Sequence, residues 1–341
     1  MGVHYRPMRP KDVRECAEIV AAHPIVSPRY GSAISQLRPA WLKLLGSEAF
    51  RNVVLEETDR FRTRMIGIGA SVFVSNHFLQ ALKTPPLLWI GPELASRIMR
   101  GDSPVLSDKE VRIANSVGGL NLVIWEACIR PEAAHRPDAY HASVASFVHY
   151  HRGFLIKELI GQVTSVKHLQ VIVNNGGFFL NASDGRYLQS PIESPAELVM
   201  TPHIWGSTRE LLIGRLGSWV SCLFDYKPPQ LGFSASEQRL LLCALEGGTD
   251  EQLADQLAIS RSGVKKTWCS IYRKVAERLP ELIPNNDEVE STLRERGKEK
   301  KQQIITYLRE HLEELRPVSR KHLVLEQYST DKGQPRERRN Q

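Results

Sequence analysis

The sequence predicts two differently built domains, a mixed α/β domain at the N-terminus and an all-α domain towards the C-terminus. Over about the first 185 residues, apolar runs rich in Val, Ile and Phe alternate with helical patterns, which is typical of a sheet with helices packed on it. From Phe233 onwards, apolar residues recur at helical spacing and helix start signals repeat. These two patterns predict the fold class of each part.

The N-terminal part is expected to form strands and helices in a definite order. A strand, two helices, three strands, a long helix and a last strand are predicted. The strands fall at 4–10, 52–58, 65–74, 118–131 and 168–183, the first helix at 11–23 and the long helix at 140–166. This order predicts a mixed sheet covered by helices.

The C-terminal part carries three helix start signals in 27 residues. Ser234 with Glu237 and Thr249 with Gln252 are capping boxes, each ahead of an apolar run. Ser260 fits the N-cap of a third helix, and a pair of glycines at 247–248 ends the first. The spacing predicts three short helices in a row.

The third helix has one apolar face and one cationic face. The apolar stripe is Val264, Trp268, Ile271 and Val275. At 100° per residue the opposite face carries Ser262, Lys266, Cys269, Ser270 and Arg273, with Lys265 and Lys274 on its flanks. Such a helix packs its apolar side on neighbouring helices, and the lysines and arginines on its other side can contact a polyanion.

The segment from Phe233 resembles the LuxR-type helix-turn-helix found at the C-termini of many bacterial transcription regulators. The resemblance rests on the FSxxE opening, the G-x-T-D-x-x-L-A-x-x-L of the middle helix and the S-x-x-x-V-K-K of the third. Gly263 and Trp268 depart from the family, which usually has threonine and a smaller aliphatic there. The resemblance implies that the third helix enters the major groove of double-stranded DNA. The DNA-binding residues expected are Arg261, Ser262, Lys265, Lys266, Thr267, Ser270, Arg273 and Lys274.

Residues 3–182 resemble GNAT-type N-acetyltransferases in the order and hydropathy of their elements. The carriers are the opening YRPMRPKDVRECAEIV and the strand LNLVIWEACIRPE. That family binds the pyrophosphate of acetyl-coenzyme A with backbone N–H groups in a glycine-rich turn after this strand. No glycine pair follows here, and Arg152 with Gly153 is the nearest remnant of a cofactor site. We therefore expect no cofactor, with acetyl-coenzyme A as the less favoured alternative.

Candidate catalytic and metal-binding residues are few. Glu126 in a strand and Glu158 in the predicted long helix could each serve as a general base, or simply line a pocket or an edge. The cluster His135, Asp138, His141, His149 and His151 lacks the spacing of a metal site, so we expect no metal. No catalytic residue is assigned, and a non-catalytic domain is favoured over an active transferase.

The remaining segments complete the predicted organisation. The N-terminal domain spans 1–185, and a proline-containing connector with an amphipathic helix spans 186–232. The DNA-binding domain with a further C-terminal helix spans 233–328, and 329–341 is expected to be a disordered tail. The apolar stripe of the C-terminal helix would serve either a homodimer or packing on the other helices.

Composition restricts the class of protein. No apolar run reaches the length of a membrane span, the start is too polar for a signal peptide, and five scattered cysteines suggest neither disulfides nor zinc. A net charge of +7 suits a polyanionic partner. We expect a cytoplasmic, nucleoid-associated regulator whose N-terminal domain senses a small-molecule or protein signal or mediates assembly. The alternative is an active N-acetyltransferase with a nucleic-acid-binding C-terminal domain.

Overall fold

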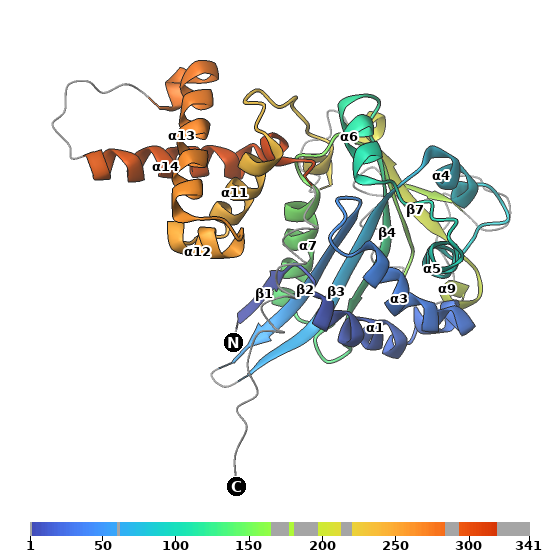
Figure 1. Ribbon diagram of the computed structural model, residues 1–341. Helices are drawn as coiled ribbons and strands as arrows, with labels where there is room; N and C mark the ends of the chain where they lie inside the picture. Colours follow the sequence, from blue (N-terminus) through green and yellow to red (C-terminus); the bar gives the residue numbers. More distant parts are fainter. Residues whose placement is uncertain are drawn as a thin grey trace, which may run out of the picture. The chain divides into compact units, whose positions relative to one another are not determined.

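The chain forms two compact units, Met1–Tyr226 and Lys227–Gln341, called unit 1 and unit 2. The computed structural model describes residues 2–59, 62–164, 177–180, 197–212, 220–283 and 293–318. All described strands belong to unit 1, and the described elements of unit 2 are helical (Figure 1).

Unit 1 is built on a mixed seven-stranded sheet with the strand order β1-β2-β3-β4-β5-β7-β6. Its strands are β1 Gly2–Arg6, β2 Phe50–Thr58, β3 Thr63–Val74, β4 Leu120–Ile129, β5 Ile156–Gln162, β6 Phe178–Leu180 and β7 Ile204–Thr208. Neighbouring strands run antiparallel except β4 and β5, which run parallel. A parallel pair needs a crossover, and the helix α7 (Pro137–His151) supplies it.

Helices cover both faces of this sheet (Figure 1). On one face lie α1 (Val13–Ala22), α2 (Ser27–Tyr30), α3 (Ile34–Leu44), α4 (Asn76–Lys83) and α5 (Ile90–Arg100), whose apolar residues join one buried cluster with strands β2 to β5. On the other face α7 packs against β1 and β2. Helix α6 (Asp108–Ser116) precedes β4, and the short helices α9 (Glu197–Met200) and α10 (Arg209–Leu212) flank β7.

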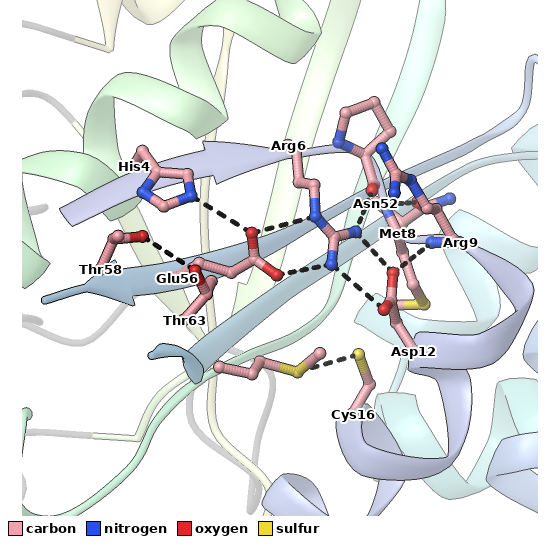
Figure 2. Close-up of polar contacts among 12 residues, drawn as sticks. His4, Arg6, Met8, Arg9, Asp12, Cys16, Asn52, Glu56, Thr58 and Thr63 are labelled. Atoms are coloured by element: carbon pink, nitrogen blue, oxygen red, sulfur yellow. Dashed lines mark hydrogen bonds and ion pairs between the residues drawn. The ribbon is translucent and has the colours of Figure 1, made fainter. Parts of the chain in front are cut away.

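A polar network fixes the first strand to its neighbours (Figure 2). The guanidinium of Arg6 pairs with Asp12 at 2.6 Å and with Glu56 at 2.5 Å, and Glu56 also accepts from His4 at 3.2 Å. The amide N–H of Met8 donates to Asn52 at 3.0 Å. Burial lowers the pKa of Arg6, but its two carboxylate partners raise it further, so the charge is retained. The edge strand β1 is therefore held by side chains as well as by its ladder.

Two expectations for unit 1 were wrong. The long helix predicted over 140–166 ends at His151, Gly153 adopts a φ of +84°, and β5 follows, so Glu158 lies in a strand. A short apolar run fits a helix or a buried strand equally well, and pairing with β4 decided for the strand. The range 186–232, predicted as a connector, supplies β7 to the sheet. Of the strand expected at 168–183, only β6 lies among the described residues.

Unit 2 contains the three predicted helices, α11 (Ala235–Leu245), α12 (Asp250–Gln256) and α13 (Arg261–Arg278), followed by α14 (Leu293–Glu310). Ser234 and Thr249 form capping boxes, and Ser260 accepts from the N–H of Gly263. The glycines at 247 and 248 have φ values of +88° and +135°, conformations that residues with a Cβ rarely adopt. The expected caps are thus confirmed as local structure.

The core of unit 2 lies where these helices meet. The whole stripe of α13 is buried: Val264, Trp268, Ile271 and Val275. Ile304, Ile305 and Leu308 of α14 are buried in the same cluster, together with Leu315. The apolar stripe of the C-terminal helix therefore packs within unit 2, which is one of the two roles expected for it. The tail expected at 329–341 lies outside the described residues.

Candidate functional site

A cavity of about 690 Å³ opens in unit 1 where β4 and β5 separate. The two strands pair from Leu120 to Val123 on β4, and no described residue of β4 beyond Val123 pairs with β5. Residues from both faces of the sheet line the cavity, among them Tyr30, Ser71, Glu126 and His151. A concave site that gathers buried polar groups is the usual form of a small-molecule site.

An irregularity in β4 shapes one wall of this cavity. Ala70 on β3 is opposite Glu126, but Ser71 is opposite Ile124, so Trp125 has no partner on β3. Side chains of a regular strand alternate between faces, and a bulge breaks that alternation. As a result, two successive side chains reach the same group: the indole N–H of Trp125 donates to Tyr30 Oη at 3.2 Å, and Tyr30 Oη donates to Glu126 Oε1 at 2.6 Å.

Glu126 is the buried carboxyl group of this wall, with an exposed fraction of 8%. Burial raises its pKa to about 7, although the hydrogen bond from Tyr30 and the charge of Arg29 act in the opposite direction. Helix α5 leaves room for the pair because a Cβ at Gly91 would overlap both Tyr30 Oη and Glu126 Oε1. A carboxyl group that titrates near neutrality in a cavity has the properties of a general base or acid.

Arg29 adds a cation to the same cavity. Its guanidinium donates to the carbonyl of Val163 at 2.8 Å and lies 4.7 Å from the centre of the Trp89 ring. Burial lowers the pKa of Arg29 to about 10, opposed mainly by the charge of Glu126. The pKa of His23, also on the wall, is lowered by burial and by Arg29. The cavity thus combines one titrating carboxyl with a retained positive charge.

The start of α7 does not fit a coenzyme A pyrophosphate. Pro137, the first residue of the helix, has no N–H, and the carboxylate of Asp138 accepts from the N–H of Ala139 at 2.9 Å. The guanidinium of Arg136 is paired with Asp138 at 2.7 Å and with Glu57. A carboxylate thus occupies the site where the helix dipole would attract the anion, and it would repel a pyrophosphate.

The residues singled out by the sequence in unit 1 have different surroundings. Glu126 lines the cavity, whereas Glu158 on β5 pairs with Lys83 at 2.7 Å and does not line it. Arg152 and Gly153, the remnant of a cofactor site, follow the C-terminal end of α7 and do not line the cavity either. Among the described residues, no three His, Cys, Asp or Glu side chains gather around a metal site.

Sequence reasoning missed three functional side chains of the cavity. Tyr30 and Ser71 were not considered, and His151 was considered only as a member of a histidine cluster. No spacing signals them, because Ser71 and His151 are 80 residues apart and Tyr30 and Glu126 are 96 apart. Only the pairing of strands and the packing of α2 and α7 bring them together.

Unit 2 presents a cationic surface on α13. Lys265, Lys266 and Arg273 are exposed, as are Arg261 and Ser262 at the start of the helix. In the part of unit 2 that the structure describes, no carboxylate pairs with Lys265, Lys266 or Arg273, whereas Arg261 pairs with Glu251 of α12. Lys266 and Arg273 lie on the face opposite the buried stripe, and Lys265 lies on its flank.

Besides Arg261, and Ser262 whose hydroxyl lies 2.8 Å from that of Ser260, three more of the predicted DNA-binding residues contact the protein itself. The ammonium of Lys274 donates to Glu237 of α11 at 2.6 Å and to the carbonyl of Gly232 at 3.1 Å. Ser270 donates to Glu237 at 2.8 Å, and Thr267 donates to the carbonyl of Gly263 at 3.0 Å. Lys274 and Ser270 thus hold α13 against α11, which leaves Lys265, Lys266 and Arg273 as the outward cations.

Glu237 is the centre of that contact. Its exposed fraction is 4%, and burial by itself raises its pKa. The hydrogen bonds from Lys274, from the N–H and hydroxyl of Ser234 and from Ser270 outweigh burial and lower the pKa to about 2. A carboxylate with this many donors stays charged at neutral pH, so the contact between α11 and α13 is permanent there.

Among the comparisons with known proteins, solved structures alone gave matches. No family model and no curated protein matches the chain. One similar solved structure, from Corynebacterium glutamicum, is described as histone acetyltransferase HPA2 and related acetyltransferase. It is 8% identical to this chain, with a TM-score of 0.36, and the match covers 61% of this chain and 97% of that one. A mosquito arylalkylamine N-acetyltransferase-like protein is 12% identical, with a TM-score of 0.36 over 61% of this chain and 100% of that one. A Vibrio cholerae and human spermidine N-acetyltransferase chimera is 10% identical, with a TM-score of 0.34 over 63% and 100%.

These similarities extend over 61–63% of this chain. None of the described helices combines the length and the apolar character that crossing a membrane requires.

Proposed function

We propose that unit 1 acts on an amine in its cavity, with Glu126 as the general base for acyl transfer, and that unit 2 binds double-stranded DNA through α13. The observation that carries the first part is the buried Glu126 carboxyl, which faces a cavity of about 690 Å³ and has a pKa raised to about 7 by burial. A base with a pKa near the ambient pH is charged often enough to accept a proton and still transfers it efficiently.

The proposed reaction uses the wall around Glu126. Tyr30 holds the carboxyl group in place through its 2.6 Å hydrogen bond. A neutral amine attacks the carbonyl carbon of an activated acyl donor, and the proton that the nitrogen loses passes to Glu126 as the leaving group departs with its bonding electron pair. Because the start of α7 does not fit a pyrophosphate, the acyl donor has to be held by the cavity walls.

The test is transfer of an acyl group by the full chain. Short-chain thioesters and amines such as spermidine or an arylalkylamine are incubated with the protein, and the amide product is measured by mass spectrometry. Glu126→Gln keeps the size of the side chain and removes the base, so we expect the rate to fall by about 100-fold or more. Glu158→Gln, a buried strand glutamate outside the cavity, is the matched control.

The second part of the proposal is supported by the outward cations of α13. Lysines and arginines on one helix face neutralise phosphates, and a helix packed on its partners by the opposite face is free to enter a major groove. Helices α12 and α13 are joined by a tight turn in which Ala258 has a φ of +49°. Binding of labelled duplex DNA at several salt concentrations measures both the affinity and the number of phosphate contacts.

A second candidate is a transcription regulator in which unit 1 binds a small molecule without catalysis. The mismatch between the start of α7 and a pyrophosphate favours it. Saturable binding of an amine to the cavity that alters DNA affinity, with no acyl transfer from any donor, would support this candidate over the transferase.

A further inference from the structure

Ser71 and His151 form a hydrogen-bonded pair inside the cavity of unit 1. Ser71 Oγ lies 2.6 Å from His151 Nε2, and both residues line the cavity although each is nearly fully buried. Ser71 comes from β3, and His151 is the last residue of α7. The pair is separate from Glu126 and has no part in the function proposed above.

The partner of the second ring nitrogen fixes the roles within the pair. His151 Nδ1 lies 2.6 Å from the backbone carbonyl oxygen of Phe147. A carbonyl oxygen only accepts, so Nδ1 carries the proton, and in the neutral ring Nε2 is left with its lone pair directed at Ser71. The ring is also held from its side, since the centre of the Phe147 ring lies 4.3 Å from that of His151.

Ser71 is consequently the donor of the short hydrogen bond. Its Oγ also lies 3.4 Å from the carbonyl oxygen of Arg51, but a hydroxyl has one proton, and the nitrogen at 2.6 Å is the closer acceptor. A nucleophile, a base within hydrogen-bond distance and a group that orients the base are the three parts of an activated serine. Here the backbone of α7 takes the orienting place that a carboxylate has in a triad.

We propose that Ser71 is a nucleophile, activated by His151, that is acylated by activated esters in this cavity. Ser71 Oγ attacks the carbonyl carbon while its proton passes to His151 Nε2. The bond to the leaving group breaks, and the alcohol or phenol departs with that proton. Water then attacks the acyl ester on Ser71 and gives its proton to the same nitrogen, which releases a carboxylic acid and restores the hydroxyl.

The substrate class follows from the walls around the pair. Phe147, Tyr150 and Val144 contribute aromatic and aliphatic surface on the α7 side of the cavity. Arg51, whose guanidinium pairs with Glu48 at 3.1 Å, lies on the same side. These surroundings suit an ester with an apolar acyl or aryl group.

The experiment maps the adduct on the full chain. The protein is treated with an alkyl fluorophosphonate and, separately, with p-nitrophenyl acetate, and peptides are read by mass spectrometry. We expect the adduct on Ser71, its loss in Ser71→Ala, and a labelling rate about 100-fold lower in His151→Gln. Ser207→Ala, a buried strand serine outside the cavity, is expected to label as the unchanged chain does.

Two results would overturn the inference. One is an unmodified Ser71 in the unchanged chain after exhaustive labelling, a measurement that needs no variant and is therefore independent of folding. The other is undiminished labelling in His151→Gln, which would show that the imidazole does not activate the hydroxyl. Circular dichroism of each variant shows whether a lost adduct reflects lost chemistry or a lost fold.

Discussion

The ammonium of Lys274 on α13 donates to the carboxylate of Glu237 on α11 over 2.6 Å, and this ion pair joins the two helices beside the buried apolar stripe of α13. Both side chains are largely buried, at 24% and 5% exposure. An acidic residue on another helix therefore supports the packing of the helix that carries the proposed DNA contact.

This relationship predicts a pH dependence of the stability of unit 2. The pKa of Glu237 is about 2 in the folded unit, against an ordinary value of 4.5. Because the folded pKa is the lower one, the stabilisation is fully present above pH 4.5 and is lost as the pH falls towards 2. Urea unfolding of residues 227–341 between pH 2 and 6 measures it. Glu237→Gln should flatten this acid dependence, and a variant with the slope of the unchanged unit would contradict the assignment.

The outward cations predict the effect of single substitutions on DNA binding. Lys266→Ala or Arg273→Ala should lower the affinity by about 1–3 kcal/mol if the side chain contacts a base. If the side chain contacts a phosphate, affinity should fall for all sequences and the salt slope should decrease by about one. Fluorescence anisotropy at several salt concentrations measures both. Lys109→Ala on α6 of unit 1 is the charge-matched control, and unchanged affinity in both α13 variants would reject the assigned face.

Trp268 predicts a structural rather than a DNA-binding phenotype. Its exposed fraction is 4%, and it packs against Tyr272 with ring centres 5.6 Å apart. Trp268→Ala should destabilise unit 2 by about 3–5 kcal/mol, enough to unfold a small helical unit. Circular dichroism of residues 227–341 shows the loss of helix. Cys269→Ala, the exposed neighbour, should keep the helix content, and a folded Trp268→Ala that only lost DNA binding would place the indole on the surface.

Glu126 predicts pH effects of opposite sign on stability and on activity. Its folded pKa of about 7 lies above the ordinary 4.5, so the folded state holds more protons between these values, and stability falls as the pH rises from 4.5 to 7. The difference corresponds to about 3 kcal/mol at most. Acyl transfer should instead increase as the pH rises through 7, because the charged form is the base. The stability and the rate of Glu126→Gln should lose this dependence on pH. If the variant keeps it, another group is responsible for the titration.

The start of α7 predicts weak binding of acetyl-coenzyme A. The carboxylate of Asp138 at the helix start accepts the N–H of Ala139 and repels an anion, and Arg136 is paired with Asp138, so a pyrophosphate is poorly held there. Calorimetry on the full chain should show no binding tighter than about millimolar, roughly −4 kcal/mol. Asp138→Ala removes the repelling carboxylate and should tighten the binding. Micromolar binding to the unchanged chain would show that the cavity holds the coenzyme in another way.

The local structure of unit 2 follows from patterns in its sequence. Capping at Ser234, Thr249 and Ser260 involves residues three apart, and the buried stripe of α13 follows from a period of 3.6 residues. Both depend on residues that are close together in the sequence, so the sequence is sufficient to predict them. The same holds for strands β2 to β4, whose apolar runs predicted them close to their observed bounds. The first strand, expected at 4–10, instead spans Gly2–Arg6.

The contacts of the site residues depend on tertiary packing. The end of α7 at His151 and the start of β5 depended on pairing with β4, because the apolar run from Leu155 fits a helix or a strand equally well. The bulge at Trp125 brings Glu126 to Tyr30, and α7 brings His151 to Ser71, across 96 and 80 residues of chain. Likewise, the sequence predicts Lys274 as a DNA-binding residue, whereas in the structure its ammonium is paired with Glu237. Contacts between residues far apart in the sequence depend on how the elements pack, which no local pattern specifies.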